Sequence, residues 1–150
     1  LSDLVNLVFI GGSAEKAKRL RVQASTLGLS ANVFFYGYVP DEDISGFYKR
    51  SRGLIFPSHF GPTNIPPLEA AICQVPFAVS DVYGMREQSG DLAFYFDPLN
   101  VTDMANACEL LWSDNEQREL KLIGLTTNQV DYDQCFRTEF LDAVNILRKE

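Results

Sequence analysis

The sequence has little of the residues that build metal sites and disulfide frameworks. It contains one histidine and three cysteines in 150 residues. The cysteines Cys73, Cys108 and Cys135 are far apart and form no C-x-x-C pair. An odd number of distant cysteines argues against a disulfide framework and against a zinc site. We therefore expect reduced thiols.

Clustered basic charge and long apolar runs are also missing. Lys and Arg number 13 against 20 Asp and Glu, with a net charge of −7, which argues against a general nucleic-acid binder. No apolar run reaches the roughly 18 residues that a membrane span needs, and no basic-then-apolar leader opens the chain. The expected location is cytoplasmic. The chain starts at Leu1 without Met, so we expect it to be a piece of a longer protein.

Short apolar runs alternate with amphipathic stretches along the chain. Strands are expected at 4–12, 32–39, 53–58, 75–81 and 92–98, and helices at 13–29, 40–51, 66–74 and 101–114, with further helical segments from Asn115 and Gln134 onward. Ser13 is the expected N-cap of the first helix. Strands that alternate with helices and are mostly apolar on both faces predict a parallel sheet covered on each side. The fold class is therefore α/β, a Rossmann-like doubly wound parallel sheet, in one domain.

Ligands of such sheets bind beyond the carboxyl ends of the strands. This rule selects Gly11-Gly12-Ser13, Gly37-Tyr38-Val39, His59 to Pro66, and Asp81 to Glu87.

The third of these segments lies in "FPSHFGPTNIPPLEAA", residues 56–71. A helix that starts near Pro66 or Pro67 presents the N–H groups of Thr63, Asn64 and Ile65, which with the helix dipole form an anion site suited to a diphosphate. Glu69, in the first turn, has two acceptor oxygens that suit a vicinal diol such as a ribose. Alternatively, Glu69 only complements the dipole and the prolines only stiffen a loop. Spacing alone leaves both readings open.

The stretch "GYVPDEDISGFYKRSRGLIFPSHFGPTNIPPLEAAICQVPFAVSDVYGMREQSGDLAFYFDP" carries a family resemblance. It resembles the nucleotide-sugar-binding C-terminal half of GT-B glycosyltransferases, specifically the large retaining family 4. The landmarks agree in order: a glycine-ended strand before "xxL/IxxxY", a "PS" strand end, "PxLEA", "GxxE" and "GDxAxxxDP". The flanks fit as well, so the resemblance covers essentially the whole chain.

The resemblance implies roles for residues around "GPTNIPPLE". The family pattern is two glutamates separated by seven residues; Glu69 matches the second, which implies a ribose contact, and Gly61 replaces the first, which in the family contacts the donor sugar. Asn64 and Ile65 would offer N–H groups to the diphosphate. Because Gly61 has no side chain to offer, Thr63 or Asn64 would have to substitute at the sugar.

The other loops match the family less specifically. Gly37-Tyr38-Val39 is similar to the segment whose backbone recognises the edge of the base, and this leaves uracil and guanine both open. Gly12, with Gly11, is similar to the glycine-rich turn near the sugar and phosphates. His59 is a weaker candidate for a hydrogen bond to the donor sugar, with a surface or core histidine as the alternative. Glu87 is a weaker candidate for the wall of the site, with a cap or brace of the following segment as the alternative.

The resemblance implies the donor-binding half of a retaining glycosyltransferase, most often one of bacterial surface polysaccharide synthesis. Its substrate would be a nucleotide diphosphosugar, a UDP- or GDP-sugar, with no metal and no other cofactor. The saccharide or lipid-linked acceptor would bind a preceding N-terminal domain absent from residues 1–150, so the isolated chain is expected to be inactive. Peripheral membrane association of the full-length protein, at the inner face of the membrane, is left open. The alternative is a non-catalytic Rossmann-like module that binds a nucleotide or a partner.

Overall fold

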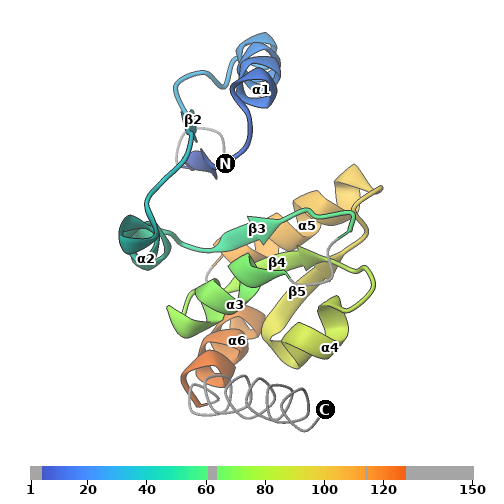
Figure 1. Ribbon diagram of the computed structural model, residues 1–150. Coiled ribbons are helices and arrows are strands. Elements are labelled where there is room, and N and C mark those ends of the chain that lie inside the picture. Colours follow the sequence, from blue (N-terminus) through green and yellow to red (C-terminus); the bar gives the residue numbers. More distant parts are fainter. Residues whose placement is uncertain (1–4, 61–63, 114, 128–150) are drawn as a thin grey trace, which may run out of the picture. The chain divides into compact units, whose positions relative to one another are not determined.

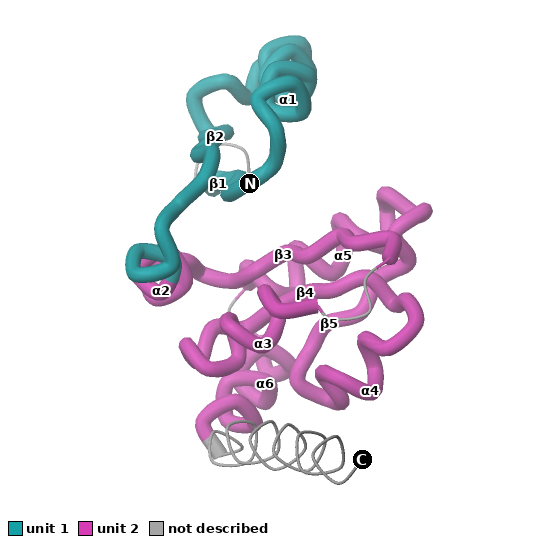
Figure 2. The backbone as a smooth tube through the Cα atoms, viewed as in Figure 1, with its two compact units in different colours: residues 1–44 teal, residues 45–150 magenta. Residues whose placement is uncertain are grey.

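The computed structural model describes residues 5–60, 64–113 and 115–127 (Figure 1). The candidate residues Gly61 and Thr63, the cysteine Cys135 and the helix expected from Gln134 lie outside the described residues. The chain divides into two compact units, residues 1–44 and 45–150 (Figure 2).

The first unit contains a strand–helix–strand motif. Strands β1 (Leu7–Ile10) and β2 (Val33–Tyr36) pair in parallel, with helix α1 (Ala14–Thr26) between them in sequence. The rings of Phe9 and Phe35 stack across the pair with their centroids 5.0 Å apart. The hydroxyl of Ser13 accepts a hydrogen bond from the Lys16 backbone N–H at 3.3 Å, which confirms the expected N-cap.

The second unit contains a three-stranded parallel sheet. Its strands are β3 (Leu54–Phe56), β4 (Phe77–Ser80) and β5 (Ala93–Phe96), in the order β3-β4-β5. Its helices are α3 (Ile65–Ile72), α4 (Met85–Ser89), the 3₁₀ helix η1 (Gly90–Leu92), α5 (Val101–Trp112) and α6 (Glu116–Thr127). Helix α2 (Asp41–Arg50) begins in the first unit, and its residues from Ser45 onward belong to the second.

Alternate residues of β4 and β5 enter two different hydrophobic clusters. Phe77, Val79 and Ala93 pack with residues of α3, α4, η1 and α6 on one face of the sheet. Ala78 and Phe94, with Phe96, pack with α5 on the other. A sheet buried on both faces by helices is the doubly wound α/β arrangement that the apolar strands predict, and the structure confirms that fold class.

The strands are shorter than the apolar runs suggest, because local backbone geometry ends them. Gly11 and Gly12 follow β1 with φ of 77° and 78°, values that residues with a Cβ rarely adopt.

Helix α4 was missed by sequence analysis; it is five residues long and begins after Gly84, whose φ is 82°. A single helical turn is too short to show the 3.6-residue period.

Candidate functional site

Helix α3 starts one residue earlier than the sequence analysis expected. Its N-cap is Asn64 and its first residue is Ile65, so Pro66 and Pro67 both fall in the first turn. Proline has no N–H, which leaves Asn64 and Ile65 to supply the N–H groups at this end. The earlier start also corrects the position of Glu69, which lies in the second turn instead of the first. Glu69 is four residues after Ile65, so the two residues share one face of the helix.

The carboxylate of Glu69 is held by a tyrosine from another helix. The hydroxyl of Tyr48, in α2, donates to Glu69 Oε2 at 2.8 Å and lies 3.3 Å from the carbonyl oxygen of Pro66. Both side chains are half-buried. Burial first, and then the hydrogen bond to the Glu69 carboxylate, raise the pKa of Tyr48 well above its usual range. Tyr48 is therefore a hydrogen-bond donor to this carboxylate throughout the physiological pH range.

Asn64 connects the start of α3 to α4. Its side-chain amide donates to the sulfur of Met85 at 3.4 Å, and its backbone carbonyl accepts from Gln88 Nε2 at 2.6 Å. Asn64 is only 4% exposed. The side chain that sequence analysis offered as a sugar contact is thus turned into the protein, toward α4.

We expect Gln88→Ala to lower the free energy of unfolding by about 1 kcal/mol, the usual contribution of one hydrogen bond. The reason is that Gln88 holds the N-cap carbonyl of α3. Gln117→Ala, at an exposed position of α6, is the matched control and should change stability by less than about 0.5 kcal/mol. Urea denaturation of both variants measures the difference, and equal losses would contradict this role of Gln88.

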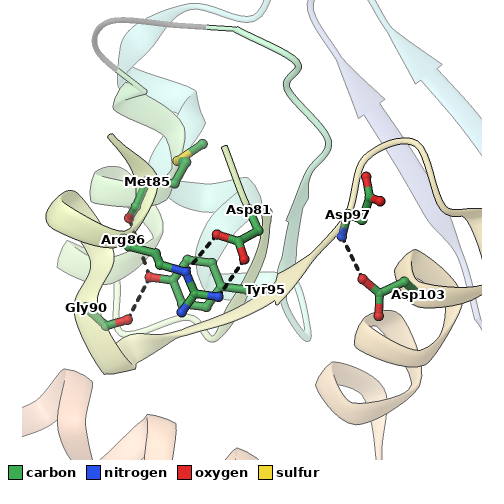
Figure 3. A network of polar contacts seen from close by, with 7 residues as sticks. All are labelled: Asp81, Met85, Arg86, Gly90, Tyr95, Asp97 and Asp103. Atoms are coloured by element: carbon green, nitrogen blue, oxygen red, sulfur yellow. Dashed lines mark hydrogen bonds and ion pairs between the residues drawn. The ribbon is translucent and has the colours of Figure 1, made fainter. Parts of the chain in front are cut away.

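A second network fixes α4 to the carboxyl end of the sheet (Figure 3). The guanidinium of Arg86 donates to both oxygens of Asp81, at 2.7 Å and 2.5 Å, and lies over the ring of Tyr95, 4.4 Å from its centroid. These donated bonds hold the pKa of the Asp81 carboxyl below its usual range. The Tyr95 hydroxyl donates to the carbonyl of Gly90 at 2.6 Å and lies 3.4 Å from the carbonyl oxygen of Met85. Residues after β4, in α4 and in β5 therefore support the element that holds Asn64.

The loop after β5 is closed by a carboxylate of α5. Asp103 accepts a hydrogen bond from the backbone N–H of Asp97 at 2.6 Å (Figure 3). Asn100 caps the same helix by accepting from the N–H groups of Thr102 and Asp103, both at 3.1 Å. The loop that follows β5 is thus fixed at the same edge of the sheet as Asp81, because parallel strands end together.

In the first unit, the structure brings two of the glycine segments together. The backbone N–H of Gly11 donates to the carbonyl of Gly37 at 2.9 Å. A cavity of about 400 Å³ lies beside them, and Gly12, Ser13 and Lys16 are among its lining residues.

The remaining candidates are placed as follows. In the first unit, Tyr38 is exposed and Val39 is buried. In the second unit, Ile65 and Glu69 lie on α3, and Asn64 is the N-cap of that helix. His59 and Glu87 are exposed. Tyr48, which holds the Glu69 carboxylate, was not among the residues that sequence analysis put forward. In the sequence Tyr48 belongs only to the I-x-x-x-Y landmark that it forms with Ile44, and that landmark does not indicate a contact with Glu69.

Two further findings concern the described residues. Among them, no group of three His, Cys, Asp or Glu side chains is arranged to hold a metal ion. Within residues 5–60, 64–113 and 115–127, no helix is both long enough and apolar enough to span a membrane.

The fold places the chain among α/β proteins with the architecture of GT-B glycosyltransferases. WaaG, "a glycosyltransferase involved in lipopolysaccharide biosynthesis", superimposes with a TM-score of 0.74 at 18% identity, over 85% of this chain and 34% of WaaG. Sucrose-phosphate synthase from Thermosynechococcus elongatus gives a TM-score of 0.65 at 20% identity, over 94% of this chain and 40% of that one. At these identities the likeness shows the fold.

The family model "Glycosyl transferases group 1" matches residues 2–121, and the chain belongs to this family. O-antigen chain mannosyltransferase B of Escherichia coli is 31% identical over 115 residues, which are 75% of this chain and 30% of that protein. O-antigen chain mannosyltransferase RfbU of Salmonella typhimurium is 30% identical over 97 residues, 65% of this chain and 28% of that protein. The chain spans less than a third of the length of these curated relatives.

Proposed function

We propose that the chain is the donor-binding, C-terminal half of a retaining family 4 glycosyltransferase of the GT-B fold. In this proposal the enzyme transfers a sugar from a nucleotide diphosphosugar to a saccharide or lipid-linked acceptor during synthesis of a bacterial surface polysaccharide. Family membership supports transferase chemistry, and the names of the relatives support the type of product. Those names also make mannose the first donor sugar to test.

The observation that carries the proposal is the arrangement at the start of α3. The N–H groups of Asn64 and Ile65 lie at the positive end of the helix, where a diphosphate is stabilised. Side chains of a helix lean toward its N-terminus, so Glu69 leans back toward the same end. A phosphate at Ile65 and a ribose diol at Glu69 can therefore belong to one nucleotide.

This arrangement also defines what the site contributes to the reaction. Breaking the bond between the sugar and the diphosphate leaves negative charge on the departing phosphate. The N–H groups at the start of α3 are fixed by the bonds from Asn64 to α4, so they are in place before that charge develops. Donors fixed in advance stabilise such a charge better than donors that must reorganise.

Isothermal titration of the 150-residue chain with UDP, GDP and ADP tests the proposal. We expect one nucleoside diphosphate to bind more tightly than the others, because the base is recognised in addition to the diphosphate. Inorganic pyrophosphate is the control, and it should bind more weakly than the preferred nucleotide. Binding of none of the three nucleotides would instead support the alternative, a non-catalytic module with a partner of another kind.

A further inference from the structure

Tyr48 makes the polar contact that fixes the Glu69 carboxylate. Its hydroxyl has a single proton, and two acceptors lie near it: Glu69 Oε2 at 2.8 Å and the Pro66 carbonyl oxygen at 3.3 Å. A hydrogen bond to an ionised acceptor is shorter and stronger than one to a neutral carbonyl. The proton therefore belongs mainly to the bond with Glu69, and this bond engages one of the two carboxylate oxygens.

The ring of Tyr48 is held in place independently of that bond. Like Phe56 and Cys73, it packs against the hydrophobic cluster formed by α3, β4 and their neighbours. An anchored aromatic ring has few accessible rotamers, so its hydroxyl occupies a defined position. The fixed hydroxyl therefore restrains the otherwise flexible Glu69 side chain.

We propose that Tyr48 is a positioning residue: it selects the Glu69 rotamer in which the other carboxylate oxygen meets the ribose diol. This inference rests on the proposed function, because it assigns Tyr48 a role at the same nucleotide site. A glutamate that is not held samples several rotamers, and a ligand must then select one of them on binding. If Tyr48 already holds the carboxylate, Glu69 loses no further rotamer freedom when the ligand binds.

The test compares Tyr48→Phe with the unmodified chain in titrations with UDP and GDP and with their 2′,3′-dideoxy forms. Phenylalanine keeps the packed ring and removes only the hydroxyl. We expect the affinity for the preferred nucleotide to fall about three- to tenfold, as for the loss of one hydrogen bond. Affinity for its dideoxy form, which has no diol, should be unchanged. In a Glu69→Gln background the same substitution should have much less effect, because the two residues act as one unit.

Tyr95→Phe is the matched control, because it also removes a half-buried hydroxyl that donates to a carbonyl, at 2.6 Å from Gly90 O. It should leave the ratio of nucleotide to dideoxynucleotide affinity unchanged, whatever it does to stability. Suppose that the unmodified chain binds UDP or GDP. The positioning role is then overturned if Tyr48→Phe loses the same affinity for the nucleotide as for its dideoxy form, or loses no affinity for either. Failure of the unmodified chain to bind UDP or GDP would overturn the proposed function, and the role of Tyr48 with it.

Discussion

Glu69→Gln is expected to weaken binding of the preferred nucleoside diphosphate about tenfold or more. Glutamine keeps the shape of the side chain and one acceptor oxygen, but it loses the negative charge. Hydrogen bonds to charged groups contribute about 1.5–3 kcal/mol, against about 1 kcal/mol for neutral pairs. A ribose diol that donates two such bonds would lose about 1–4 kcal/mol, and a loss of about 1.4 kcal/mol is a factor of ten.

The affinity for pyrophosphate distinguishes the loss of a ribose contact from a general loss of the binding site. It has no ribose, so its affinity should change little in Glu69→Gln, or rise as a nearby negative charge is removed. Glu109→Gln, at an exposed position of α5, is the matched control and should leave both affinities unchanged. Titration calorimetry measures all of these values.

The alternative, that Glu69 acts only as a charge on the helix dipole, makes a different prediction. In that case Glu69→Gln would lower stability by about 0.3–1 kcal/mol and leave nucleotide binding intact. The position of Glu69 in the second turn makes this alternative weaker than the sequence suggests, because the dipole effect falls off within the first turn. The ribose contact would nevertheless be excluded if the unmodified chain and Glu69→Gln had the same affinity for UDP and the same affinity for GDP.

The alternation of strands and helices was predictable because each element has its own local signal. Phe77, Ala78 and Val79 form an apolar run followed by Ser80 and Asp81, and all four residues of the strand Phe77–Ser80 are buried in the structure. The expected strand at 75–81 is therefore confirmed, with ends that differ by one or two residues. Those ends depend on backbone hydrogen bonds between strands, which composition does not reveal.

The start of α3 shows that an error of one residue in the predicted helix start changes the roles inferred for its neighbours. The two prolines suggested a helix beginning at one of them, because proline is common at the first helical position. Asn64 is instead the N-cap, a position that asparagine also favours, although its side chain makes no capping bond. Its amide donates to Met85 in α4, and this tertiary contact is invisible to a local pattern.

The Tyr48–Glu69 pair could not be derived from spacing. Its members are 21 positions apart and belong to different helices. Local rules relate residues three or four positions apart on one helix, so they give no information about such a pair. Only the fold brings the phenol of α2 to the carboxylate of α3.

The largest expected loss of stability comes from Phe77→Ala. Phe77 is 1% exposed in β4 and lies in the cluster that α3, α4 and α6 share with the sheet. Replacing a buried phenylalanine by alanine removes apolar contacts and leaves a cavity, which together lower the free energy of unfolding by about 3–5 kcal/mol. Domains of this kind have total stabilities of about 5–15 kcal/mol, so this loss is a large part of the total.

The single tryptophan, Trp112 at the end of α5, reports this loss, because it belongs to the same unit as Phe77. Urea denaturation followed by its fluorescence should show a much lower midpoint for Phe77→Ala. Phe77→Leu, which retains most of the buried volume, should lie between that variant and the unmodified chain. Phe60→Ala is the matched control, since Phe60 is 87% exposed and should change stability by less than about 0.5 kcal/mol. Similar midpoints for Phe77→Ala and Phe60→Ala would show that the cluster shared by α3, α4, α6 and the sheet is not the main source of stability in this unit.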